Sequence, residues 1–195
     1  MRSAFTAIAA RGALVLVALT ATVPVARATT LLRLSVEEMT QRADDVTLGT
    51  VSSVESRWTD DHQQILTYVT LARPERLKGD DTGDVTFVLL GGRVGDDIML
   101  AVGQPEFAVG EKALVFLTRM ASAKRLAVPT DRWLLGLGQG KWSIATDRAT
   151  GREVGTLDIG GARGIVRPGV ALESRLGLET LRSRVRAGLT PPATR

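Results

Sequence analysis

The chain contains no cysteine and only one histidine among its 195 residues. The lack of cysteine excludes disulfide bonds, thiolate nucleophiles and the zinc or iron–sulfur sites that cysteine builds. A single histidine also excludes the usual histidine-rich metal sites. Hydrophobic residues make up 44% of the sequence and charged residues 24%. This balance indicates a globular protein rather than a disordered or fibrous one.

The first 28 residues have the pattern of a secretory signal peptide. Arginines flank the apolar run 13–19, and Pro24 precedes the small-residue site Ala26-Arg27-Ala28. This order predicts cleavage after Ala28 and a mature chain that begins Thr29-Thr30. The apolar run is too short for a membrane-spanning helix. The sequence therefore predicts an exported protein, periplasmic or secreted, with no stable membrane anchor in its mature chain.

The charge of the mature chain differs from that of the whole sequence. The predicted leader holds three of the 25 basic residues and none of the 21 acidic ones, which leaves 22 basic against 21 acidic residues. The overall charge of +4 therefore comes mostly from the leader. Because a near-neutral chain has little attraction for polyanions, the sequence predicts no nucleic-acid partner.

Helices are expected near both ends of the mature chain. Ser35 and Glu38 have the spacing of a capping box, and the helix that they begin should end near Arg42 or Ala43. Near the C-terminus, apolar residues at 178, 181 and 185 fall on one helix face, and Gly188 is placed to end this second helix. We interpret it as an amphipathic helix that packs on the rest of the protein, after a linker over 160–169.

Between the helices the pattern is that of short β-strands separated by turns. Gly49 interrupts the first strand and predicts a bulge there. No helical pattern alternates with the strands, so the spacing favours a barrel or a sandwich over a parallel sheet with crossover helices. The predicted strands are 46–58, 65–79, 85–92, 97–102, 112–118, 134–145 and 152–157.

The last long strand contains Gly136, Gly138 and Gly140, followed by Lys141. A phosphate-binding loop would need a different glycine position and a serine or threonine after the lysine, where this chain has Trp142. We therefore interpret the glycines as one face of the strand, left flat for a neighbouring backbone or ring.

No familiar catalytic constellation is present, and the sequence predicts no catalytic residue, no cofactor and no metal site. The histidine His62 lies beside Asp60 and Asp61 in a polar connection between two predicted strands. An imidazole beside carboxylates is the one grouping that would suit an envelope hydrolase. A solvated hairpin turn explains the same residues.

Residues 34–145 contain a series of strand and turn motifs. The motifs are Ala43-Asp44-Asp45-Val46, 48–51, 67–70, 77–79, Gly91-Gly92, 103–105, Gly110-Glu111, 114–117 and 136–141. Together they resemble a group of exported bacterial proteins of unassigned function, whose fold is similar to the OB-fold domain of tissue inhibitors of metalloproteinases.

The resemblance implies an OB-like antiparallel β-barrel, closed or partly open, with a short N-terminal helix and a C-terminal amphipathic helix. In the inhibitors the first two residues of the mature chain, Cys-Thr, enter the protease cleft. Here Thr30 matches the second position, and Thr29 stands in place of the cysteine.

From these observations the expected organisation is a signal peptide (1–28), a barrel domain (29–160), and a linker with the C-terminal helix (161–195). The leading hypothesis for function is an exported, non-enzymatic binding module, with an extracellular or envelope protein such as a metalloprotease as its partner. Two alternatives stay open at this point. They are a structural envelope protein and a carboxylate-dependent hydrolase that uses Asp60, Asp61 and His62.

Overall fold

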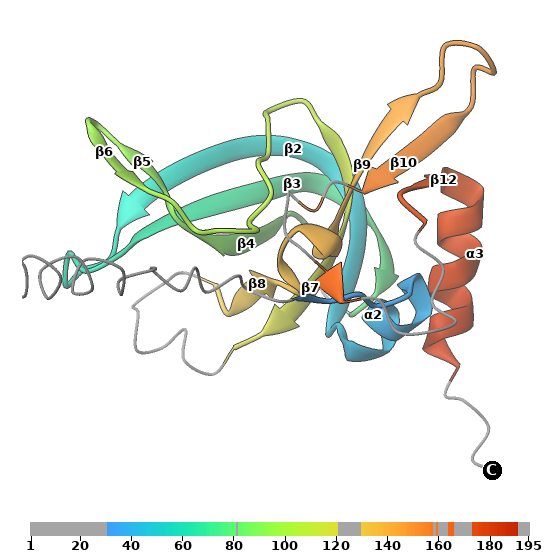
Figure 1. Cartoon of the computed structure of the whole chain (residues 1–195), viewed down its shortest axis with the longest axis horizontal. Helices are drawn as coiled ribbons and strands as arrows, with labels where there is room; N and C mark the ends of the chain where they lie inside the picture. The colour runs from blue at the N-terminus through green and yellow to red at the C-terminus, as the bar shows by residue number, and fades with distance from the viewer. Residues whose placement is uncertain are drawn as a thin grey trace, which may run out of the picture.

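The computed structural model describes residues 31–80, 82–120, 130–157, 159, 164–165 and 173–190. This part of the chain is mainly β, with helix α2 (Val36–Arg42) near its start and helix α3 (Leu178–Leu189) near its end (Figure 1). None of the helices in these ranges is long and apolar enough to cross a membrane. The expected leader with Ala26 and Ala28, the expected N-terminus Thr29-Thr30 and most of the linker lie outside the described residues.

Five strands form a closed barrel. They are β2 (Asp45–Trp58), β3 (Ile65–Lys78), β4 (Val85–Leu90), β7 (Lys112–Arg119) and β8 (Arg132–Leu134). Strand β2 pairs antiparallel with β3 and β7, and β3 pairs antiparallel with β4. The short strand β8 closes the barrel, because it pairs parallel with β4 and antiparallel with β7. This connectivity makes the protein an OB-like barrel, as the resemblance implied.

Bulges allow β2 and β3 to coil around the barrel and to continue beyond it as a long hairpin. The register between them shifts at Leu48/Thr50, as the position of Gly49 predicted. A Cβ atom on Gly49 would lie 2.9 Å from Pro74 Cβ on β3, so the bulge depends on glycine there. Another shift at Val51/Ser53 begins the half of the hairpin that extends away from the helices, which we call the arm (Figure 1).

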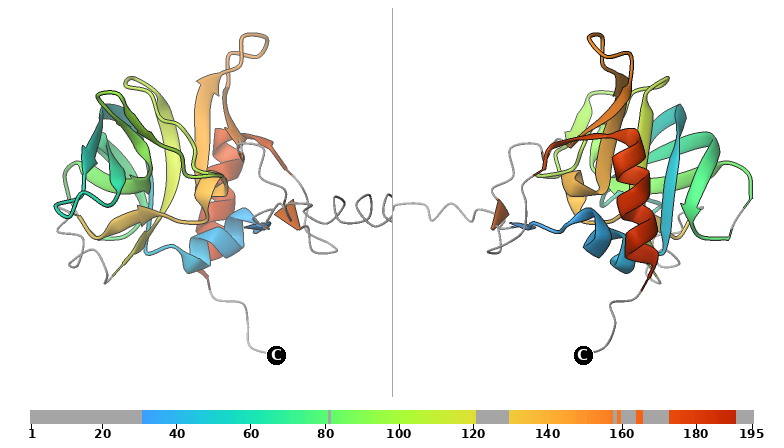
Figure 2. Two further views of the ribbon diagram at one scale, coloured as in Figure 1. Left: turned by 60° about the vertical axis from the view of Figure 1, so that its left-hand side comes forward. Right: turned by 90° about the vertical axis from the view of Figure 1, so that its right-hand side faces the viewer.

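Further short strands extend the sheet. Strand β9 (Lys141–Thr146) pairs with β7, followed by β10 (Glu153–Leu157) and β12 (Arg175–Gly177). Strands β5 (Gly92–Val94) and β6 (Asp97–Met99) form a separate hairpin, and β1 (Leu31–Leu32) pairs with β11 (Gly164–Ile165). Figure 2 shows α2 and α3 together on the side of the molecule away from the arm.

The protein has two large hydrophobic cores on opposite faces of the same strands. The barrel interior contains Phe87, Val115 and Leu117, among others. The second core lies between the outer face of the sheet and the two helices, and includes Phe116 and Trp142. The predicted apolar face of α3 is confirmed, because Leu178, Leu181 and Val185 are all buried in this second core.

The capping box is also confirmed. Glu38 N–H donates to Ser35 Oγ at 3.2 Å, and Ser35 N–H donates to a Glu38 carboxylate oxygen at 2.9 Å.

Gly188, by contrast, does not end α3. It lies within the helix, where its lack of a side chain lets α2 approach, since a Cβ there would lie 2.7 Å from Thr40 Cβ.

The prediction of one strand over 134–145 is wrong. Residues Leu137–Gly140 form a 3₁₀ turn, and β9 begins only at Lys141. Gly136 has a left-handed backbone with φ of 71°, and a Cβ on Gly140 would lie 2.1 Å from the Leu135 carbonyl oxygen. The glycines therefore make a tight turn between two strands. The strand expected over 97–102 is likewise shorter, ending at Met99.

Candidate binding groove

The residues that the sequence singled out as a candidate hydrolase site lie in the turn at the tip of the arm. Asp60, Asp61 and His62 are all exposed there. Asp61 Oδ1 accepts hydrogen bonds from Thr59 Oγ1 at 2.6 Å and from Gln63 N–H at 3.1 Å, and these bonds hold the pKa of Asp61 below its usual value. His62 has φ of 53° and stacks on Trp58 with 5.8 Å between ring centroids.

These contacts shape the turn, and the Asp61 carboxylate is used to cap its backbone. Within the described ranges no three histidine or carboxylate side chains gather closely enough to hold a metal ion.

A groove with a volume of about 370 Å³ lies beside the arm, where Val54, Ser56 and Thr67 line it. Volumes of this order are typical of pockets that bind ligands or partner side chains. Strands β2 to β4 form one wall, and the β5–β6 hairpin with the connection to β7 forms the other. Apolar side chains dominate the lining, among them Val54, Leu89, Leu90, Ile98, Met99, Leu100 and Phe107.

Two glycines and two hydroxyl groups form the floor of the groove. Thr67 Oγ1 donates to the Gly91 carbonyl oxygen at 2.7 Å and lies 2.9 Å from Ser56 Oγ. The Thr67 hydroxyl donates its proton to the Gly91 carbonyl oxygen, so the Ser56 hydroxyl is the donor in the bond between the two side chains. A Cβ atom on Gly92 would lie 2.4 Å from both hydroxyl oxygens, so only glycine lets the chain cross here.

The buried Lys141 stabilises the wall of the groove that the connection to β7 forms. Lys141 Nζ lies 2.7 Å from Glu111 Oε1, donates to the Glu106 carbonyl oxygen, and lies 4.3 Å from the centroid of the Phe107 ring. Ser143 Oγ donates to the same carboxylate of Glu111 at 2.7 Å. These contacts hold the 106–111 segment against β9, and the wall of the groove is thus preorganised by charge-assisted bonds.

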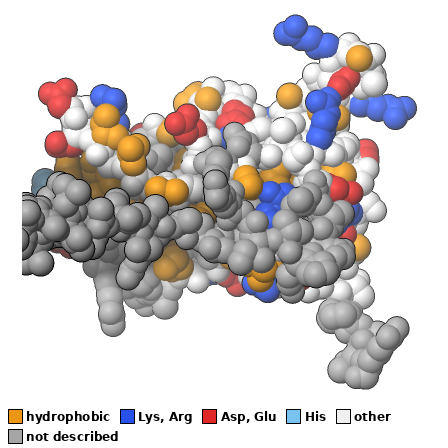
Figure 3. Space-filling model, viewed as in Figure 1, with side chains coloured by type: hydrophobic (Ala, Val, Ile, Leu, Met, Phe, Trp, Pro, Cys, Tyr) orange, Lys and Arg blue, Asp and Glu red, His pale blue; other side chains and the backbone are white. Residues whose placement is uncertain are grey.

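The rim of the groove exposes large hydrophobic side chains. Leu100 is 87% exposed, Val102 75%, Ile98 53% and Leu90 41%. Figure 3 shows hydrophobic side chains at the surface over the half of the molecule that carries β5 and β6. Exposed apolar side chains beside a groove are typical of a site that binds a partner, because water-exposed apolar surface is unfavourable unless it is covered.

Sequence reasoning did not find this groove. The sequence predicted a strand over 97–102, but β6 ends at Met99, and Leu100 and Val102 are exposed beyond it. Their exposure depends on how the β5–β6 hairpin packs, and Gly92 at the start of β5 lies close to the arm residues Ser56 and Thr67.

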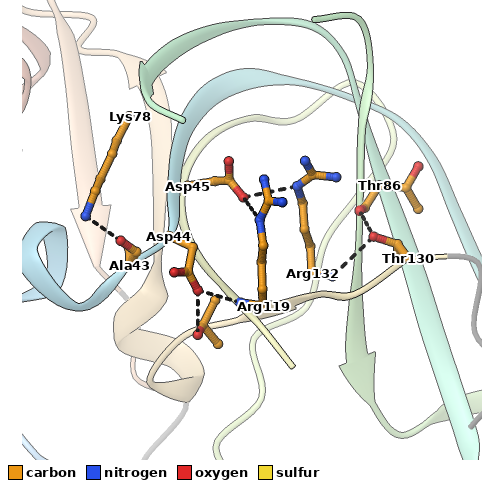
Figure 4. Close-up of polar contacts among 9 residues, drawn as sticks. Ala43, Asp44, Asp45, Lys78, Thr86, Arg119, Thr130 and Arg132 are labelled. Carbon is orange, nitrogen blue, oxygen red and sulfur yellow. Dashed lines mark hydrogen bonds and ion pairs between the residues drawn. The ribbon is translucent and has the colours of Figure 1, made fainter. Parts of the chain in front are cut away.

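A second polar cluster lies towards the opposite end of β2 and closes the barrel (Figure 4). The Asp45 carboxylate has no exposed surface. Its Oδ2 atom lies 3.1 Å from Arg132 Nε on β8 and 3.5 Å from Arg119 Nε on β7. Burial lowers the pKa of the neighbouring Arg76, and the charge of Arg132 adds to this effect. Because these ion pairs join β2 to β7 and β8, the cluster has a structural explanation.

Comparisons with protein-family models, with curated proteins and with solved structures give no match to this chain. The groove and the barrel topology are therefore the basis for a functional proposal.

Proposed function

We propose that this protein is an exported, non-enzymatic binding module that holds apolar side chains of a partner protein in the groove. The observation that carries the proposal is the groove itself, with a preorganised wall and an exposed apolar rim at Ile98, Leu100 and Val102. An OB-like barrel supports it, because this architecture commonly presents binding surfaces on its strands and loops. Export is proposed from the signal-peptide pattern of residues 1–28.

A protein partner suits the rim better than a small molecule does. Leu100 lines the groove but is largely exposed, and the exposed Val102 lies outside the lining. A small ligand in the groove would therefore leave part of this apolar surface in water. Apolar anchors in a pocket surrounded by a broader contact area are typical of protein interfaces.

The test is affinity capture with matched variants. The mature chain, immobilised through its C-terminus, is exposed to envelope and secreted fractions of the source cell. Leu100→Asp places a charge on the rim, whereas Val109→Asp makes the same kind of change at a residue that is 66% exposed and outside the groove lining. We expect Leu100→Asp to reduce capture of a specific protein at least about tenfold and Val109→Asp to leave it unchanged. Equal capture by both variants would contradict the proposal.

Metalloprotease inhibition is a narrower form of the same proposal, and one contact of the barrel favours it. The buried amide of Gln139 donates to the Leu32 carbonyl oxygen at 3.1 Å and accepts from Leu34 N–H at 3.1 Å. Gln139 thereby holds the chain just after the proposed N-terminus Thr29-Thr30, and an N-terminus that enters a protease cleft needs such support.

The inhibitor proposal is tested with a zinc metalloprotease and two N-terminal forms. We expect the form that begins at Thr29 to inhibit the protease, and a form with one extra residue before Thr29 to lose inhibition. Gln139→Ala is expected to weaken inhibition without changing the N-terminal sequence. No inhibition by the Thr29 form would overturn this narrower proposal and leave the groove proposal in place.

A further inference from the structure

Half of strand β2 has an open edge. On the side away from β3, strand β7 pairs with β2 only over Asp45–Thr50. The last backbone bonds on this side join Val51 N–H to the Glu111 carbonyl and Gly110 N–H to the Val51 carbonyl, each at 2.8 Å. Among the residues that the structure describes, no strand pairs with Ser52–Trp58 on this side. Figure 1 shows this part of β2 along the outer margin of the arm.

Two backbone hydrogen bonds establish which backbone groups the open edge presents. Thr59 N–H donates to the Gln64 carbonyl, so the backbone of Thr59 points towards β3. Gly91 N–H donates to the Ile65 carbonyl, so Ile65, the partner of Trp58, points away from β2. Because backbone groups alternate along an antiparallel strand, the N–H and C=O groups of Val54, Ser56 and Trp58 point to the open edge.

The side chains along this edge are complementary to themselves. Glu55 and Arg57 are exposed on the outer face of the arm, where they form an ion pair within the chain, and Arg57 lies 5.5 Å from the centroid of the Tyr68 ring. In an antiparallel pairing of two copies centred on Ser56, Glu55 of each copy lies opposite Arg57 of the other. On the groove side of the sheet, Val54 lies opposite Trp58.

We propose that two copies of this protein pair through Ser52–Trp58 of β2, antiparallel about Ser56, to form one continuous sheet. The pairing satisfies the open backbone groups of three residues in each copy and forms two ion pairs across the interface. A register centred on Glu55 instead places two Glu55 carboxylates opposite each other, so the charges favour the register about Ser56. Both grooves then open on the same face, and the dimer binds two partner sites at once.

The proposal is tested by sedimentation of the mature chain over a range of concentrations. We expect reversible dimerisation of the wild type. Glu55→Arg and Arg57→Glu each place like charges opposite one another at two positions, and each is expected to weaken dimerisation about tenfold. Arg148→Glu makes the same charge change in an exposed turn between β9 and β10, and is expected to dimerise like the wild type.

Mixing the two single variants gives the decisive measurement. Glu55→Arg presents two basic residues and Arg57→Glu two acidic residues, so an equimolar mixture is expected to dimerise at concentrations at which each variant alone is mostly monomeric. The double variant Glu55→Arg/Arg57→Glu is expected to recover self-association. Far-UV circular dichroism verifies that each variant is folded. A wild type that sediments as a monomer at every concentration, or a mixture that stays monomeric, would overturn the proposal.

Discussion

Asp45 is a fully buried acid in the barrel. Its carboxylate has no exposed surface and lies between the guanidinium groups of Arg119 and Arg132. These arginines belong to β7 and β8, which pair antiparallel in the closed barrel and place Arg119 opposite Arg132. A buried charge needs partners because desolvation strongly disfavours it. The ion pairs of Asp45 therefore connect β2 to β7 and β8 within the barrel.

We expect Asp45→Asn to reduce the free energy of unfolding by about 2 to 4 kcal/mol, because the amide removes the buried negative charge that Arg119 and Arg132 contact. Urea unfolding at neutral pH measures this loss. The matched control is Asp44→Asn, since Asp44 is exposed and accepts hydrogen bonds from Arg119 N–H and Thr118 Oγ1 that an amide oxygen also accepts. We expect this control to cost less than about 1 kcal/mol. Equal losses would show that the ion pairs of Asp45 do not stabilise the barrel.

Glu37 gives the protein a specific acid sensitivity. The Arg184 guanidinium hydrogen-bonds its carboxylate at 2.6 and 2.8 Å, and this bond lowers the pKa of Glu37, in opposition to partial burial. A pKa lowered by folding stabilises the protein at pH values above the unfolded-state pKa. This stabilisation is lost as the pH falls through the lower, folded-state pKa. The contact between α2 and α3 should therefore weaken in acid.

We expect Glu37→Gln to be less stable than the wild type at neutral pH, and we expect the difference to narrow below the ordinary range of glutamate, about pH 4 to 5. Urea unfolding at a series of pH values measures it. Glu179→Gln is the control, because Glu179 pairs with Arg182 but its side chain is 79% exposed. A difference between Glu37→Gln and wild type that stays constant at all pH values would contradict this linkage.

At the scale of elements, helices α2 and α3 depend on a glycine for their close approach. Gly188 lies inside α3, where alanine is normally favoured by about 1 kcal/mol. Here a Cβ atom would lie 2.7 Å from Thr40 Cβ and 2.8 Å from the Glu37 carbonyl oxygen. Because one contact is with backbone, the clash is relieved only by separation of the helices.

We expect Gly188→Ala to destabilise the protein by about 1 to 3 kcal/mol, despite its better helix propensity, because overpacking outweighs it. Thermal or urea unfolding measures the change. Gly177→Ala at the other end of α3 is the matched control. Its nearest neighbour would be Thr180 Oγ1 at 3.8 Å, so we expect a change within about 1 kcal/mol. A stabilised Gly188→Ala variant would show that the helices have room to move apart.

Elements that local chemistry determines could be predicted from the sequence. The capping box at Ser35 and Glu38 and the apolar face of α3 depend on residues a few positions apart. The sequence did not predict the turn at Gly136–Gly140, because alternating glycines also fit a strand. No neighbouring residue indicates that Gly136 has a left-handed φ. Closure of the barrel depends on Val88 pairing with Trp133, 45 positions away, through a strand of three residues. The groove depends on similar long-range packing.

At the scale of the whole molecule, the two large cores share their strands. Consecutive residues of β7 face opposite sides, so that Val115 packs in the barrel interior and Phe116 packs under the helices. Strand β2 contributes in the same way, with Val51 inside the barrel and Val46 under the helices. Neither core can be exposed without disturbing the strands that hold the other, and we therefore expect the described fold to unfold as one cooperative unit.

This cooperativity is tested with one truncation in each core. Phe87→Ala in the barrel interior and Leu181→Ala under the helices should each cost about 2 to 5 kcal/mol, because both side chains are fully buried. In each variant, far-UV circular dichroism and tryptophan fluorescence, to which the buried Trp133 and Trp142 contribute, should give the same urea midpoint. If Leu181→Ala instead separates the two midpoints, the helices and the outer sheet unfold independently of the barrel. The binding groove would then belong to a unit that is stable without the C-terminal helix.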